Sequence, residues 1–119
     1  DADKLARAFN NVLKNAISYS YPNTVIRVAV KQEAEHILLE FHNQGDEIPE
    51  QKLEMIFEKF FRLDKARSTA SGGAGLGLAI AKEIVEAHGG SIYADSNMEE
   101  TVFYIKLPMP ATDTELQSA

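Results

Sequence analysis

Three glycines alternate with small and apolar residues at positions 73, 75 and 77, directly before a strongly apolar helical segment. A residue without a Cβ atom lets backbone N–H groups approach an anion closely, and a helix N-terminus adds partial positive charge. Gly73, Gly75 and Gly77 therefore predict a cradle for phosphate groups. A flexible linker is the alternative, and the apolar helix that abuts the glycines argues against it.

The glycines do not fit either of two common phosphate-binding motifs. A long polar loop precedes them where a dinucleotide-binding motif requires a strand, and no Gly-Lys-Ser/Thr sequence follows. The cradle must therefore belong to another kind of site.

Two asparagines one helical turn apart, Asn11 and Asn15, form a second candidate group. Their side-chain oxygens suit Mg²⁺, a hard cation that prefers oxygen ligands and often shares them with phosphates. Asparagine is mildly unfavourable inside a helix, so two on one stripe require a reason. Taken alone, however, a solvated helix face is the commoner explanation of such a pair.

Two further segments could contribute to a site. Lys59, Arg62, Lys65 and Arg67 form a basic group in a chain of formal net charge −6, and arginine binds phosphate oxygens through two parallel hydrogen bonds. The turn at residues 43–49 could bring a polar side chain and a close backbone to the rim of a pocket. Solubilising surface charge and an ordinary strand-to-helix turn are the alternative explanations.

The elements that must position these residues follow from apolar periodicity and turn signals. We expect a helix, two strands, a short helix from Pro49 with Leu53, Ile56, Phe57 and Phe60 on its apolar face, a mobile loop, a third helix and a final hairpin. Apart from the short helix, their ranges are 3–19, 25–31, 37–43, 62–74, 76–88, 91–96 and 101–107. This order predicts an α+β fold, with a mixed, mostly antiparallel sheet that carries its helices on one face.

The composition excludes several classes of protein. A chain of 119 residues fits one domain, and its acidic balance argues against non-specific nucleic-acid binding. The absence of cysteine excludes a disulfide framework, a zinc–thiolate site and a thiol nucleophile. No apolar run approaches the roughly 18 residues of a membrane span, and no signal peptide is present. Because helix-like sequence starts immediately after Asp1, we expect a piece of a longer protein.

The order of the candidate segments resembles the catalytic, ATP-binding domain of bacterial sensor histidine kinases. Residues 11–16 resemble the N box, 43–45 the G1 box, 56–62 the F box and 73–80 the G2 box. The resemblance extends from residue 3 to about residue 110 and is strongest to vancomycin-resistance sensor kinases of the VanS type. It implies a two-layer α/β sandwich of the Bergerat (GHKL ATPase) type, with a mobile lid over ATP.

The resemblance also implies ATP and Mg²⁺ as cofactors. Asn15 would bind the Mg²⁺ that bridges the phosphates, Asn43 would face the adenine amino group, and Thr101 would support Asn43 directly or through water. The implied nucleotide-binding residues are Asn11, Asn15, Tyr19, Asn43, Gly45, Ile48, Arg62, Arg67, Gly73, Gly75, Leu76, Gly77, Leu78 and Thr101, of which Asn11, Asn15 and Arg62 would be catalytic. Asn43 stands where most relatives have Asp, and Glu47 and Ser18 replace a glycine and a cation, so a modest ATP affinity is expected.

The resemblance implies transfer of the γ-phosphoryl group to a histidine. Related ATPases and anti-sigma serine kinases carry a general-base Glu at the position of Asn11, which cannot take a proton at neutral pH. An anti-sigma-type serine kinase and a non-catalytic nucleotide-sensing module are the alternatives. His36, His42 and His88 do not lie in the helical context of the family's acceptor, so the acceptor is expected on a separate dimerisation domain.

The expected organisation follows from the same resemblance. Residues 1–110 would be the catalytic domain and 111–119 a C-terminal tail. The isolated chain would be monomeric with little turnover, and would belong to a homodimeric, membrane-anchored kinase with a cytoplasmic catalytic domain. Its partners would be the dimerisation domain and a response regulator.

Overall fold

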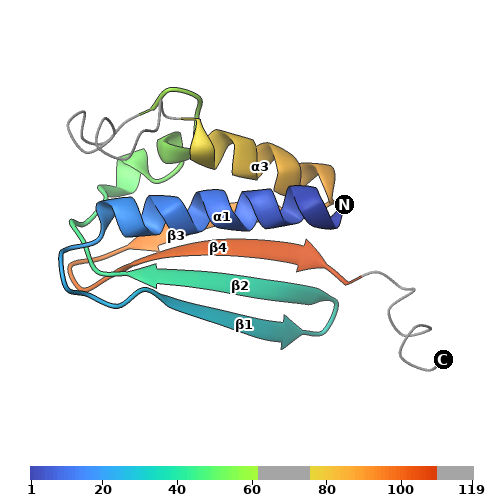
Figure 1. Cartoon of the computed structure of the whole chain (residues 1–119), viewed down its shortest axis with the longest axis horizontal. Helices are drawn as coiled ribbons and strands as arrows, with labels where there is room; N and C mark the ends of the chain where they lie inside the picture. The colour runs from blue at the N-terminus through green and yellow to red at the C-terminus, as the bar shows by residue number, and fades with distance from the viewer. Residues whose placement is uncertain (62–75, 110–119) are drawn as a thin grey trace.

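The computed structural model describes residues 1–61 and 76–109, which form a sheet with two α-helices on one face (Figure 1). In chain order the elements are α1 (Ala2–Tyr19), β1 (Arg27–Glu33), β2 (His36–Asn43), the 3₁₀ helices η1 (Glu50–Lys52) and η2 (Met55–Phe57), α3 (Gly77–Ala87), β3 (Ser91–Ser96) and β4 (Thr101–Pro108). The predicted α+β sandwich is confirmed. Within these described residues, no helix is long and apolar enough to cross a membrane.

The sheet has the strand order β1-β2-β4-β3, so β2 and β4 lie at its centre. Each of these strand pairs is antiparallel, which is more regular than the mixed sheet expected. Because side chains alternate along a strand, Phe41 and Phe103 face the helices and join the core. Their neighbours Glu40 and Tyr104 face the opposite side of the sheet.

Small residues let α1 pack closely against the rest of the core. Ala8, Val12 and Ala16 recur every four residues and are fully buried, which places them on one face of the helix. Asp1 caps the helix, since its carboxylate accepts hydrogen bonds from the backbone N–H groups of Asp3 and Lys4. The predicted helix at residues 3–19 is therefore confirmed.

The second helix, α3, packs beside α1 and runs in the opposite direction (Figure 1). Its buried residues Leu78, Ala79, Ala81 and Val85 follow helical spacing. Gly89, with φ of 79°, supplies the left-handed conformation that ends many helices. The predicted helix at residues 76–88 is confirmed, including its glycine stop.

Two local predictions differ from the structure. The strand predicted at residues 25–31 is confirmed with shifted bounds: it begins at Arg27, because the chain first turns at Asn23, where φ is 62°, and the Thr24 hydroxyl donates to the carbonyl oxygen of Tyr21 at 2.6 Å. The short helix expected after Pro49 is instead the two separate 3₁₀ turns η1 and η2.

The predicted apolar face of that short helix also differs. Ile56 and Phe57 are adjacent in η2 and are both buried, as expected for that apolar face. Phe60 is 68% exposed and has φ of 66°, so it does not join the core as expected. The loop predicted at residues 62–74 lies outside the described residues.

The termini of several elements meet at one end of the sandwich (Figure 1). The C-terminal ends of α1, β2 and β3 and the N-terminal ends of α3 and β4 all lie there. Among the described residues, Tyr19, Asn43, Gly77 and Thr101, which are predicted to bind a ligand, lie at these ends, whereas Asn11 lies in the middle of α1.

Candidate functional site

The two asparagines predicted to contact metal and phosphate lie on α1, at the edge of its buried stripe. Asn11 and Asn15 are both half-buried and adjoin the fully buried Val12 and Ala16. Residues four apart lie on the same face of a helix, so both carboxamides line one side of α1.

The N-terminus of α3 lies beside the first of these asparagines. A Cβ atom placed on Gly77 would be 4.0 Å from the Cβ atom of Asn11. Leu76 precedes the helix, and its side chain caps none of the backbone N–H groups of the first turn. Those groups keep their capacity to bind an anion. The structure thus brings the asparagine helix and the start of the glycine-preceded helix together.

The turn after β2 is fastened to the other end of α1. Gly45 forms a β-bridge with Ser20, and the backbone N–H of Tyr21 donates to the carbonyl oxygen of Gln44 at 2.7 Å. A Cβ atom on Gly45 would collide with the backbone carbonyl oxygen of Tyr19. The close approach of this turn to α1 therefore requires glycine.

The end of β2 carries a buried polar side chain whose oxygen has no partner among the described residues. Asn43 is 3% exposed, and its Oδ1 atom accepts no hydrogen bond from the part of the chain that the structure describes. An unpaired buried acceptor is costly, typically by about 1–3 kcal/mol. Asn43 is therefore a candidate ligand-binding residue, whose oxygen would accept a hydrogen bond from a ligand's N–H group.

The residue paired with Asn43 across the sheet also contacts β3. Thr101 on β4 is the register partner of Asn43, and its hydroxyl lies 2.6 Å from the hydroxyl of Ser96 on β3. The Ser96 hydroxyl also accepts a hydrogen bond from the backbone N–H of Ile48 at 2.9 Å. Sequence reasoning missed Ser96 entirely.

The contacts of Gly77 and Gly45 with α1 mark the two ends of the candidate site along this helix. Asn11 lies beside Gly77, and the backbone carbonyl oxygen of Tyr19, two turns further on, lies beside Gly45. The two positions are about 12 Å apart along the helix axis, and Asn15 lies between them. An elongated ligand could therefore place an anionic group at α3 and a hydrogen-bonding group at Asn43.

The other predicted site residues divide into two groups. Leu78 is 6% exposed and packs in the hydrophobic core, whereas Leu76 is half-buried at the start of α3. Four predicted ligand-binding residues lie outside the described residues, namely Arg62, Arg67, Gly73 and Gly75.

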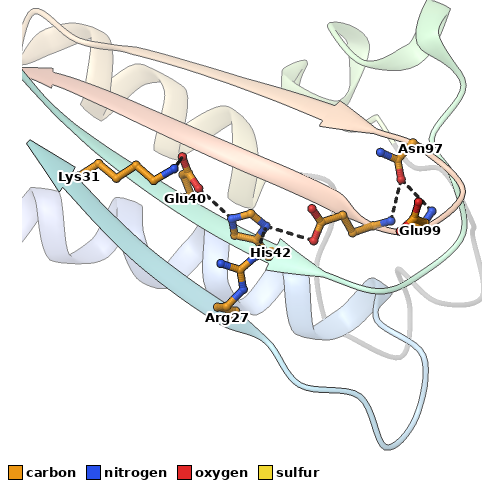
Figure 2. A network of polar contacts seen from close by, with 7 residues as sticks. Arg27, Lys31, Glu40, His42, Asn97 and Glu99 are labelled. Carbon is orange, nitrogen blue, oxygen red and sulfur yellow. Dashed lines mark hydrogen bonds and ion pairs between the residues drawn. The ribbon is translucent and has the colours of Figure 1, made fainter. Parts of the chain in front are cut away.

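A network of charged side chains occupies the sheet face opposite the helices (Figure 2). His42, only 9% exposed, bonds through Nε2 to Glu40 at 2.9 Å, and its Nδ1 lies near both Arg27 and Glu100. Glu40 also pairs with Lys31 at 3.0 Å. The hydrogen bond from His42, reinforced by Lys31, lowers the pKa of the Glu40 carboxyl despite the opposing effect of its burial.

Comparison with known proteins identifies the class to which this fold and site belong. Residues 1–111 match the family described as histidine kinase-, DNA gyrase B- and HSP90-like ATPase. The chain is 56% identical over 108 residues to the sensor protein VanS of Enterococcus faecium, and 44% identical over 113 residues to VanSC of Enterococcus gallinarum. These alignments cover 91% and 95% of this chain, but only 28% and 31% of those proteins.

Solved structures agree with the family match. The mycobacterial sensor histidine kinase MprB superposes with a TM-score of 0.79 at 37% identity, covering 92% of this chain and 74% of that one. A catalytic domain of the histidine kinase ThkA gives a TM-score of 0.78 at 29% identity, covering 91% and 68% of the two chains.

The chain therefore belongs to the histidine kinase-like ATPase family. Within that family it corresponds to the ATP-binding catalytic domain of two-component sensor histidine kinases. The sequence-based identification of the family and of the GHKL-type fold is confirmed.

Proposed function

We propose that the chain binds Mg-ATP along one side of α1 and transfers the γ-phosphoryl group to a histidine on a separate dimerisation domain. The observation that carries this proposal is the position of Asn11 beside the start of α3, with Asn15 one turn further towards the turn at Gly45. The N-terminus of α3 can bind the phosphates. The buried Oδ1 atom of Asn43, which has no partner among the described residues, can accept a hydrogen bond from the base.

The adenine end of the proposed site is formed by the strand termini and the turn after β2. The unpaired Oδ1 atom of Asn43 would accept a hydrogen bond from the adenine amino group. Gly45 keeps the backbone of the turn close to this side chain, and Ile48, buried at 7% exposure, would contribute an apolar wall. Thr101 would complete this end from β4.

The phosphate end combines the helix terminus with the metal-binding asparagine. Asn15 offers a carboxamide oxygen, a ligand type that Mg²⁺ accepts together with phosphate oxygens and water. When bound, Mg²⁺ supplies charge neutralisation for the transferring phosphates. Arg62, Arg67, Gly73 and Gly75 are proposed to complete this end on the strength of the sequence resemblance alone.

The residue at position 11 favours a histidine acceptor. Water and serine need a general base to become effective nucleophiles, whereas a neutral imidazole is already nucleophilic. Asn11 adjoins the proposed phosphate site but offers only a carboxamide, which cannot take up the proton. The domain is therefore suited to position ATP for a nucleophile that needs no activation.

Transfer of labelled phosphate from ATP tests this function. The chain is mixed with a histidine-bearing dimerisation domain, and the stability of the product in acid is measured. An acid-labile phosphohistidine supports the proposal. Acid-stable phosphoserine would support the serine-kinase alternative, and bound nucleotide without transfer would support the nucleotide-sensing alternative.

The wider setting is also a proposal. The similarity to VanS favours a role in antibiotic-resistance signalling, with a response regulator as the downstream partner. We propose that residues 1–110 form a monomeric catalytic domain, that 111–119 form a tail, and that the whole kinase is a homodimer anchored in the membrane with this domain in the cytoplasm.

A further inference from the structure

Ser96 occupies the last position of β3, next to the proposed adenine end. Its register partner on β4 is Thr101, and the register partner of Thr101 on β2 is Asn43. The three residues therefore form one row across adjacent strands, on the sheet face that carries the helices. Thr101 and Asn43 are both buried, at 2% and 3% exposure.

The Ser96 hydroxyl connects this row to the turn after β2. It accepts the backbone N–H of Ile48 at 2.9 Å and lies 2.6 Å from the Thr101 hydroxyl. A serine hydroxyl has one donor and two acceptor sites, so it can make both contacts at once. Ile48 is 7% exposed. Without the Ser96 hydroxyl, its largely buried N–H group would lose this hydrogen-bond acceptor, which is unfavourable.

The turn is thus held from two sides. On one side, Gln44, Gly45 and Asp46 contact the end of α1 and the residues that follow it. On the other side, the hydrogen bond from Ile48 to Ser96 fastens the turn to the β3–β4 hairpin. The position of the Ile48 backbone relative to Asn43 consequently depends on where Ser96 lies.

We propose that Ser96 is a positioning residue for base recognition, which fixes the Ile48 backbone and the direction of the Thr101 hydroxyl around the adenine of ATP. This inference rests on the proposed function. Ser96 acts through Ile48 and Thr101, at the opposite end of the proposed site from Asn11 and Gly77, so its effect should be on recognition of the base and not on binding of the phosphates.

Two nucleotides that differ at the purine 6-position test this role. The affinities of ATP and ITP are measured by calorimetry for the wild-type chain and for Ser96→Ala, Ser96→Thr and Ser91→Ala. The wild type is expected to prefer ATP, because inosine lacks the 6-amino group. Ser96→Ala should weaken ATP binding about tenfold and ITP binding much less, so the ratio of ATP affinity to ITP affinity should fall. Ser96→Thr retains the hydroxyl and should keep the wild-type ratio.

The control and a second variant make the result decisive. Ser91, exposed at the opposite end of β3, should tolerate alanine without a change in either affinity. If Ser96→Ala folds poorly, Thr101→Val removes the partner hydroxyl and should narrow the preference in the same way. In the double variant the effect should not exceed that of Ser96→Ala, because Ser96→Ala already removes the hydroxyl pair together with the hydrogen bond from Ile48.

Each of the remaining outcomes contradicts the inference. If Ser96→Ala lowered the affinities for ATP and ITP equally, the role of Ser96 would be structural. If both affinities were unchanged, Ser96 would have no role in nucleotide binding. Equal binding of the two nucleotides by the wild type would show that the base is not recognised here, while the phosphate site stands. Failure of the wild type to bind either nucleotide would overturn the proposed function itself.

Discussion

Gly77 at the start of α3 faces Asn11 in the middle of α1, with 4.0 Å between the Asn11 Cβ atom and a Cβ atom placed on the glycine. These residues are far apart in the sequence, and the packing of α1 against α3 brings them together. The N-terminus of α3 therefore lies beside the asparagine side chains of α1. A helix N-terminus can bind a phosphate, and carboxamide oxygens can bind the metal ion that accompanies it.

Asn15→Ala should abolish the Mg²⁺-dependent part of ATP binding and leave the fold intact. The side chain is half-buried on α1, and alanine has the higher helix propensity, so stability should stay equal or rise by about 0.5 kcal/mol. ATP titrations with and without Mg²⁺, together with thermal melts, measure both effects. Asn10→Ala, an exposed change on the same helix, is the control, and an unaltered affinity of Asn15→Ala in Mg²⁺ would refute the metal assignment.

Gly77→Ala should weaken ATP binding with little effect on the stability of the fold. The added methyl group makes only an ordinary contact with Asn11, so the free energy of unfolding should change by less than about 1 kcal/mol. The same methyl group would occupy space beside the proposed phosphate position, and ATP affinity should fall about tenfold. Chemical denaturation and ATP titration measure the two quantities.

Gly45→Ala provides the contrasting case for that variant. Its methyl group would collide with the Tyr19 carbonyl oxygen, a backbone atom that cannot move aside cheaply. We expect a loss of stability of about 1–3 kcal/mol. If Gly77→Ala destabilised the chain as much as Gly45→Ala, the space beside Asn11 would be part of the core and not of a binding site.

Asn43→Leu should weaken ATP binding without a matching loss of stability. The leucine is similar in shape and removes a buried acceptor that has no partner in the described structure, so the free energy of unfolding should be unchanged or higher. The adenine amino group would lose its acceptor, and ATP affinity should fall at least tenfold. A large loss of stability with ATP affinity retained would mean that Asn43 has a structural role.

The charged network on the open sheet face should make stability depend on pH. The pKa of Glu40 is lowered in the folded chain from its ordinary value of 4.5. Its carboxylate therefore contributes stability above that value, and the contribution is lost as the pH falls through the lower, folded-state pKa. Glu40→Gln should cost about 1.5 kcal/mol at neutral pH and progressively less in acid.

Urea denaturation at a series of pH values measures this difference. The exposed Glu99 supplies the control, since Glu99→Gln should leave the pH dependence of the wild type unaltered. A gap between wild type and Glu40→Gln that stayed constant from neutral pH to pH values well below 4.5 would contradict the account of Glu40.

The elements with strong local signals could be predicted from the sequence. The apolar spacing of α1 and the paired glycines after α3 act within a few residues, so they fixed these helices correctly. The segment after Pro49 could not be predicted in the same way. Its 3₁₀ turns and the exposed Phe60 depend on how Ile56 and Phe57 reach a core built from distant residues.

The candidate site shows the same division. Asn11, Asn15 and Gly77 could be proposed as site residues from residue chemistry and family resemblance, because each has a distinctive local pattern. Ser96 has no such pattern, since a serine at a strand end is unremarkable in sequence. Its proposed role depends on contacts that form only when β3 pairs with β4 and the turn at Ile48 folds onto the hairpin.

Calorimetric titration of the wild-type chain with ATP, in the presence and absence of Mg²⁺, tests the central claim most directly. The account predicts saturable binding of one ATP per chain, clearly tighter with Mg²⁺ than without it. Absence of binding in both conditions, or an affinity that Mg²⁺ does not change, would contradict a magnesium-bearing nucleotide site beside α1.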